Sequence, residues 1–211
     1  MLTVSTPATV TDLTTLDRVK SDLQITGSSE DDYLRGQIAA VTDLIVRHLG
    51  VVPAGASRTL ARETLVETLR PDQMRERILL SRFPVVSIDS ITEDDEAVTE
   101  YEIEDAAAGI VRRLDEDGDR SCWAAGKIIA AYTAGWVMPG HPGADLPAAI
   151  EAAAVELVGS FRSARSRDPL VRQESVPGVA DVSYWVQSPA EAGELPPAVV
   201  TKLAPYRRIA L

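Results

Sequence analysis

The stretch from Lys127 to Arg165 constrains the fold more than any other, because its hydrophobic period changes once and sharply. In KIIAAYTAGW the apolar residues alternate with period two, which is typical of a pleated strand. Gly135 lies where this strand must bend, and the following VMPGHPGAD cannot continue it. Pro147 suits the first turn of a helix, and apolar residues then recur at helical spacing up to Phe161. The stretch therefore predicts a strand, a tight bend and an amphipathic helix.

Two helices are expected before this stretch, after a Thr- and Val-rich lead over residues 1–13. Thr14 is a suitable N-cap for a short helix that ends before Gly27. Ser29 is a suitable cap for a longer helix, with acidic residues in the first turn, where the helix dipole favours anions. Gly50 ends this second helix, whose apolar stripe consists of Leu34, Ile38, Val41, Ile45 and Leu49.

Residues 58–136 are expected to form an antiparallel β section between the helices. Short β-type segments alternate there with turn signals. These turns are expected at residues 70–73, at the acidic run 93–96, around Gly109 and at residues 115–120.

The chain after Arg165 is expected to be more loosely structured. It contains two polar, Pro-containing breaks, one possible short strand within VADVSYWV, and a final helical turn or two from Pro197. We therefore predict an α+β fold, in which a small helical bundle with an inserted antiparallel β section forms the body over residues 1–165. An extended C-terminal arm follows over residues 166–211, and we expect residues 175–211 to be dispensable for folding of the body.

Charge and composition exclude several classes of protein. The net charge of −11 argues against a protein that wraps DNA regardless of sequence. With one cysteine the chain forms no internal disulfide, and with two histidines a His/Cys metal site is nearly excluded. The N-terminus lacks the pattern of a signal peptide, and the longest apolar run is too short and too polar to span a bilayer. We therefore expect no membrane partner, and synthesis in the cytoplasm.

No motif of a catalytic, cofactor or metal site is present. The chain lacks the nucleophile elbow, the phosphate-binding glycine loops and the zinc-binding HExxH pattern. The DEDGD run at 115–119 does not have the spacing of a calcium loop, which needs a carboxylate where Arg113 stands. We therefore expect no enzyme activity, no cofactor and no metal.

Candidate partner-binding residues lie near and beyond the end of the last strong helix. Trp185 falls in the arm, where an aromatic residue either packs back on the body or docks into a partner. The arginines after Arg162 either stabilise the helix terminus or contact an acidic neighbour or nucleic acid. The expected partner-binding residues are Arg165, Arg167, Arg172, Tyr184, Trp185, Tyr206, Arg207 and Arg208.

The order of these elements resembles a known family. The features that carry the resemblance are the two capped N-terminal helices, FPVVSIDSI, YEIED–G–IVRRL, the YTAGW strand, and Leu146-Pro147 before an Ala-rich helix ending in Arg. Over roughly residues 10–165 the chain is similar to the head–tail connector proteins of tailed phages and gene transfer particles, also called adaptor or head-completion proteins.

This resemblance implies a structural role in the virion, at the head–tail junction. It implies a ring of about a dozen copies that lies under the portal protein, extends the channel for double-stranded DNA and docks the stopper or tail. An acidic channel wall would let DNA slide without sequence-specific contact. Two alternatives stay open: a stopper or tail-completion ring of the same particle, and a small-ligand-binding or hydrolytic domain with the same order of elements.

Overall fold

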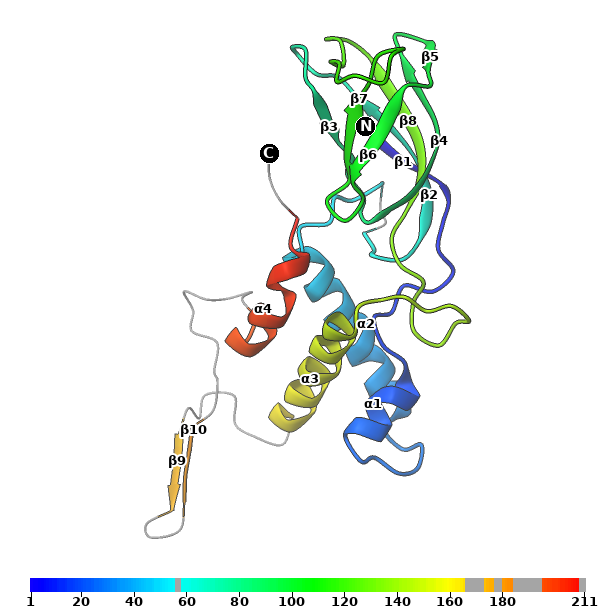
Figure 1. Cartoon of the computed structure of the whole chain (residues 1–211). Coiled ribbons are helices and arrows are strands. Elements are labelled where there is room, and N and C mark those ends of the chain that lie inside the picture. The colour runs from blue at the N-terminus through cyan, green and yellow to red at the C-terminus, as the bar shows by residue number, and fades with distance from the viewer. Residues whose placement is uncertain (56–57, 166–172, 177–179, 184–194, 209–211) are drawn as a thin grey trace. The chain divides into compact units, whose positions relative to one another are not determined.

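The computed structural model describes residues 1–55, 58–165, 173–176, 180–183 and 195–208 (Figure 1). Its contacts divide the chain into two compact units, each assembled from segments that are far apart in the sequence. The first unit comprises Met1–Asp12, Asp43–Leu146 and Arg207–Leu211, and the second comprises Leu13–Thr42 and Pro147–Tyr206. The first unit, called the β unit below, contains a five-stranded and a three-stranded sheet, and the second, called the helical unit, contains most of the helices and a two-stranded sheet. This content confirms the predicted α+β fold.

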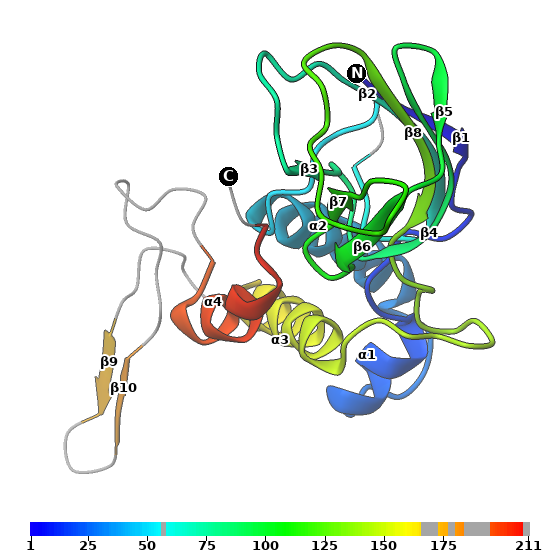
Figure 2. The same ribbon diagram turned by 45° about the horizontal axis from the view of Figure 1, so that its top comes forward.

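The first unit contains a five-stranded antiparallel sheet in the order β1-β2-β8-β4-β5 (Figures 1 and 2). Its central strand, β8 (Ile128–Ala134), is the strand that the YTAGW stretch predicts, and the alternate residues Ile128, Ala130 and Tyr132 are buried. The other strands are β1 (Leu2–Thr6), β2 (Glu63–Leu69), β4 (Val85–Glu93) and β5 (Glu96–Val98). The lead over residues 1–13, for which no element was predicted from the sequence, contains β1, which pairs with β2 as an edge strand.

A three-stranded antiparallel sheet, in the order β3-β7-β6, completes this unit. Its strands are β3 (Arg77–Leu79), β7 (Ile110–Arg113) and β6 (Tyr101–Asp105). Residues of both sheets contribute to one buried cluster, which includes Leu65, Ile91, Val111, Trp123 and Tyr132. The strands from β2 to β8 therefore form the β section expected between residues 58 and 136.

The bend after β8 requires glycine. Gly135 has a φ of +99°, and a Cβ added there would lie 2.5 Å from the carbonyl oxygen of Ala61. Its N–H donates to the carbonyl oxygen of Pro84 at 2.8 Å, and the N–H of Trp136 donates to that of Leu60 at 2.9 Å. The backbone thus leaves β8 through a close approach to residues 60–61 that only glycine permits.

The second unit contains α1 (Leu16–Asp22), most of α2 (Asp31–His48), α3 (Ala148–Ala164) and α4 (Pro197–Leu203), with a short 3-10 turn at Ala204–Tyr206. The predicted cap of α1 is wrong by one residue. Thr15 caps the helix by accepting from the N–H of Arg18 at 3.1 Å, whereas the Thr14 hydroxyl is buried and donates to Glu151 at 3.3 Å. The predicted apolar faces are buried at Leu34, Ile38, Val41, Ile150, Ala153, Ala154, Leu157 and Val158.

The described parts of the predicted arm contain regular structure. The strands β9 (Gln173–Val176) and β10 (Ala180–Ser183) form an antiparallel pair. Helix α4 packs on α3, buries Val199 and Leu203, and forms an ion pair between Lys202 and Glu156. Helix α4 therefore covers part of α3, and the expectation that residues 175–211 are dispensable for folding of the body stays a prediction. The boundary at residue 165 stays a prediction.

Helices long and apolar enough to cross a bilayer do not occur among the described residues.

Candidate functional site

Four of the predicted partner-binding residues, Arg167, Arg172, Tyr184 and Trp185, lie outside the described residues. The other four belong to two separate places. Arg165 lies at the end of α3 in the helical unit, whereas Tyr206 is followed by Arg207 and Arg208, which belong to the β unit.

The end of α3 carries an ion pair and an exposed cation. The Arg162 Nε donates to Glu30 Oε2 at 2.8 Å, and this hydrogen bond lowers the pKa of the Glu30 carboxyl below its ordinary value. Arg165 is exposed, and its guanidinium lies 4.7 Å from the centroid of the Tyr33 ring. Ser163 and these charged residues line an open hollow of about 650 Å³. Arg162 is thus held within the chain, while Arg165 remains accessible to a partner.

Of the two C-terminal arginines, Arg208 is bonded within the chain, like Arg162, and Arg207 is exposed, like Arg165. The Arg208 N–H donates to the carbonyl oxygen of Leu49 at 2.9 Å, and its Nη1 donates to that of Ser81 at 3.2 Å. These bonds satisfy an acceptor just after α2, so Arg208 stabilises the fold. Arg207 is exposed, and its positive charge adds to burial in lowering the pKa of His48. Of the two, Arg207 is the residue that a partner can reach.

The acidic runs at 93–96 and 115–119 were predicted only as turns, and the acidic segment that contains both was not singled out from the sequence. Residues 85–120 contain 13 acidic and 3 basic residues, a net charge of −10 in a chain whose total is −11. Twelve of these carboxylates are exposed, whereas Arg112 is buried and Arg113 is half-buried. A charge count over segments, in place of one over the whole chain, locates this acidic segment.

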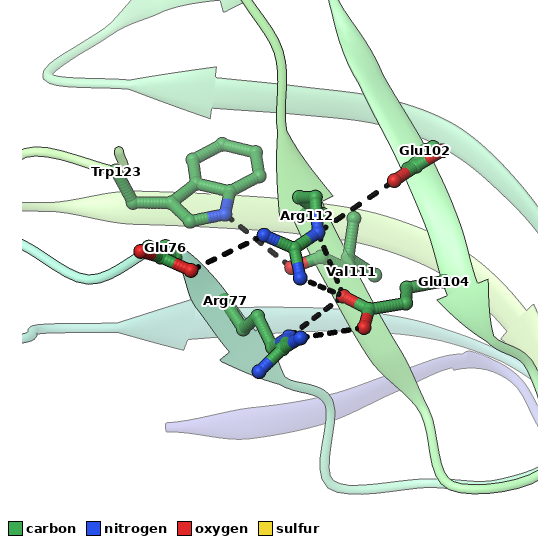
Figure 3. Close-up of polar contacts among 7 residues, drawn as sticks. All are labelled: Glu76, Arg77, Glu102, Glu104, Val111, Arg112 and Trp123. Atoms are coloured by element: carbon green, nitrogen blue, oxygen red, sulfur yellow. Dashed lines mark hydrogen bonds and ion pairs between the residues drawn. The ribbon is translucent and has the colours of Figure 1, made fainter. Parts of the chain in front are cut away.

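Arg112 organises the carboxylates of the small sheet (Figure 3). It stands on the central strand β7 with 1% of its side chain exposed, and its Nε donates to Glu104 Oε2 at 2.8 Å. Glu104 also accepts from the Arg77 Nε at 2.7 Å, and Arg112 Nη1 donates to Glu76 at 3.3 Å. The hydrogen bonds from Arg77 and Arg112 lower the pKa of Glu104 to about 2. Glu104 therefore stays ionised at neutral pH, and the cluster ties all three strands together.

The β unit contains two acidic loops, and an ion pair of 4.0 Å between Arg113 Nε and Glu93 Oε2 joins the segments beside them. One is the β4–β5 turn, where Asp94 accepts from the Lys127 N–H at 2.9 Å. The other contains residues 115–119, where Asp115 accepts from the Asp119 N–H at 2.8 Å. Arg113 links their flanking segments, since its Nη1 donates to the carbonyl oxygens of Glu100 at 2.5 Å and Leu114 at 2.6 Å. Both loops present exposed carboxylates to solvent. In the part of the chain that the structure describes, no group of three or more His, Cys, Asp or Glu residues is arranged to hold a metal ion.

The acidic surface of residues 85–120 repels polyanions and attracts cationic partners.

The buried polar groups of the β unit have structural roles. The Tyr132 hydroxyl donates to Glu67 Oε2 at 2.8 Å, and burial is the main reason why the pKa of Tyr132 is raised above its ordinary value. The Arg82 side chain donates to the carbonyl oxygen of Thr59 and pairs with Glu63, with 3.5 Å between its Nη2 and Glu63 Oε2. These contacts link β2, β8 and the β3–β4 loop.

One family model matches the N-terminal part of the chain. The family described as "Phage gp6-like head-tail connector protein" matches residues 13–75. The match covers α1, α2 and the strand β2. It confirms the predicted resemblance to head–tail connector proteins. A comparison with curated proteins found no match.

Solved structures match over the full length of the chain. A chain in the neck of an empty gene transfer agent particle, computed with C6 symmetry, matches with a TM-score of 0.57 and 16% identity. Chains in the virion of a native particle and in its neck computed with C12 symmetry match with TM-scores of 0.55 and 0.52, at 16% and 15% identity. Each match covers 100% of this chain and 97% of the other. At these identities the matches show a shared fold.

Proposed function

We propose that this chain is a structural head–tail connector in the neck of a tailed phage or gene transfer particle. The observation that carries the proposal is the full-length fold match to chains in the gene transfer agent neck, together with the connector family match over residues 13–75. The head–tail junction of the virion, which the sequence resemblance implies, agrees with both findings. The role is structural, since the matched family and structures are connector and neck components.

The chain acts as one copy in a ring. The matched necks have C6 and C12 symmetry, which supports a cyclic homo-oligomer here. In this ring the chain is an adaptor: it binds under the portal protein, extends the DNA channel and provides the docking surface for the stopper or tail.

The charge of the chain suits a channel through which DNA must move. Tight binding to DNA requires cations that neutralise phosphates, whereas the acidic segment 85–120 presents twelve exposed carboxylates. Double-stranded DNA therefore passes the ring without sequence-specific contact and without being retained.

Electron microscopy of the purified chain with the portal protein of the same particle tests this function. We expect a ring with rotational symmetry stacked on one face of the portal. Absence of a ring, both for the chain alone and for the mixture, would contradict the proposal.

The same experiment separates the adaptor from its nearest alternative, a stopper or tail-completion ring. An adaptor binds the portal directly. A stopper binds only after another ring protein has been added, so a mixture that stacks only with a third component would favour the alternative.

A further inference from the structure

The strand β1 leaves one edge of the five-stranded sheet open. It pairs with β2, and no other partner strand occurs for it among the described residues. Residues 1–11 contain no charged side chain, although charged residues make up 25% of the whole chain. Uncharged open edges are unusual, because proteins normally protect such edges with charges, proline or a covering segment.

The register of β1 shows which backbone groups face outward. The N–H of Met1 donates to the carbonyl oxygen of Thr68 at 2.7 Å, and the N–H of Thr68 donates to that of Met1 at 2.8 Å. This hydrogen-bonded pair is followed by Leu2 opposite Glu67, Thr3 opposite Val66 and Val4 opposite Leu65. In an antiparallel ladder the bonded pairs alternate, so the N–H and C=O groups of Leu2 and Val4 point away from β2. They form a ready backbone template for one more strand.

The hairpin formed by β9 and β10 provides candidate strands for this template. In the described residues its two strands pair only with each other, and they form a separate two-stranded sheet. An isolated two-stranded hairpin is marginally stable in water, and it gains stability when it joins a larger sheet. Each hairpin strand has four residues, close to the five residues of β1.

Charge favours β1 over the other open sheet edges as the pairing site for this hairpin. The hairpin strands contain Glu174 and Asp181 and no basic residue. The edge strand β6 contains Glu102, Glu104 and Asp105, and the edge strand β5 follows the acidic turn, so both repel an acidic hairpin. The edge strand β3 has three residues, one of which is the ion-paired Arg77. The longer, uncharged edge of β1 carries no such penalty.

We propose that the β9–β10 hairpin of one copy adds to the β1 edge of a neighbouring copy, and so extends the five-stranded sheet across the contact. Closure of a ring requires two different surfaces that fit each other, and this chain carries both. Main-chain hydrogen bonds provide the affinity, as in other cases of strand addition. The inference deepens the proposed function by naming the contact between copies in the ring.

Cross-linking between chains tests the contact. In a Cys122→Ser background, a chain with Thr3→Cys is mixed with a second, size-tagged chain that has one cysteine at a hairpin position from 173–176 or 180–183. Thr3 is exposed, and it takes the non-bonded position toward an added strand, where opposite side chains approach closely enough for a disulfide. We expect mild oxidation to give heterodimers at a restricted set of hairpin positions.

Two variants in the Thr3→Cys chain provide the matched control. Val4→Pro removes the outward N–H, whereas Val4→Ala loses similar packing and keeps it. We expect Val4→Pro to lower the heterodimer yield about tenfold and Val4→Ala to leave it nearly unchanged, provided that both melt at similar temperatures. A chain with Ser90→Cys, exposed on the inner strand β4, measures random collision.

Each outcome decides one question. Heterodimer yields no higher than that of Ser90→Cys at every hairpin position, or yields unaffected by Val4→Pro, would overturn the hairpin contact. If rings on the portal form without the cross-link, the contact is wrong and the connector function stands. If the cross-link forms and no ring does, the contact stands and the ring function is wrong.

Discussion

At the scale of single residues, Gly135 determines how the chain leaves the central strand. Its φ of +99° disfavours any L side chain, and an added Cβ would lie 2.5 Å from one carbonyl oxygen and 2.7 Å from another. Gly143 provides a matched control, because its φ is +77° and an added Cβ would meet no atom within 4 Å.

We expect Gly135→Ala to lower the free energy of unfolding by roughly 3 kcal/mol or more, since backbone strain and a clash with main-chain atoms combine. Gly143→Ala carries only the conformational cost of about 1 kcal/mol. Urea denaturation of both variants measures the difference. Equal losses of stability would show that the contact with residues 60–61 is not needed for the bend.

At the scale of elements, α4 shows where sequence patterns were sufficient and where they were not. A helical turn from Pro197 was predicted, but its place in the fold was not, because the apolar residues of so short a segment indicate no particular partner. The structure gives that partner: α4 packs on α3 and buries Val199 and Leu203.

The packing of α4 leads to a direct prediction. We expect Leu203→Ala to destabilise the chain by about 2–5 kcal/mol, the usual cost of a large-to-small change in a core. Lys202→Ala removes a partly exposed ion pair on the same helix and should cost less than about 1 kcal/mol. Thermal and urea unfolding compare the two variants. A Leu203→Ala protein as stable as the Lys202→Ala protein would contradict the packing of α4.

The strand β1 was missed for a different reason. Strong alternation or an amphipathic stripe identifies an element by itself, as in β8 and α2. The segment LTVST alternates apolar and polar residues only from Leu2 to Ser5, a weaker signal than the seven residues of β8, and its side chains are half-buried or exposed. It becomes a strand because β2 offers it an unpaired edge, and that is a property of the sheet.

At the scale of the whole molecule, the uneven charge predicts how the chain behaves toward DNA. We expect no measurable binding to double-stranded DNA even at low ionic strength, because an acidic surface gains nothing from counterion release. Gel shift or fluorescence anisotropy at about 50 mM salt measures this.

A charge series in the 115–119 loop provides the control for that measurement. Changing Asp115, Asp117 and Asp119 to Asn should leave binding undetectable, whereas changing all three to Lys should produce weak binding that disappears as salt rises. Salt-sensitive DNA binding by the unchanged protein would contradict a channel wall that lets DNA slide.

The sequence by itself determined the elements whose signal is local: the strand–bend–helix stretch, the two N-terminal helices, the β section and its turns. Backbone preferences and hydrophobic period act within a few residues, so they can be read from neighbouring positions. Tertiary structure alone decided that β1 pairs with β2 at the edge of the sheet, that α4 covers α3, that Arg208 bonds to the carbonyl oxygens of Leu49 and Ser81, and that Arg112 collects carboxylates from neighbouring strands. Each of these contacts joins residues that are far apart in the sequence. They depend on which strand edges, helix faces and polar groups the rest of the fold leaves without a partner.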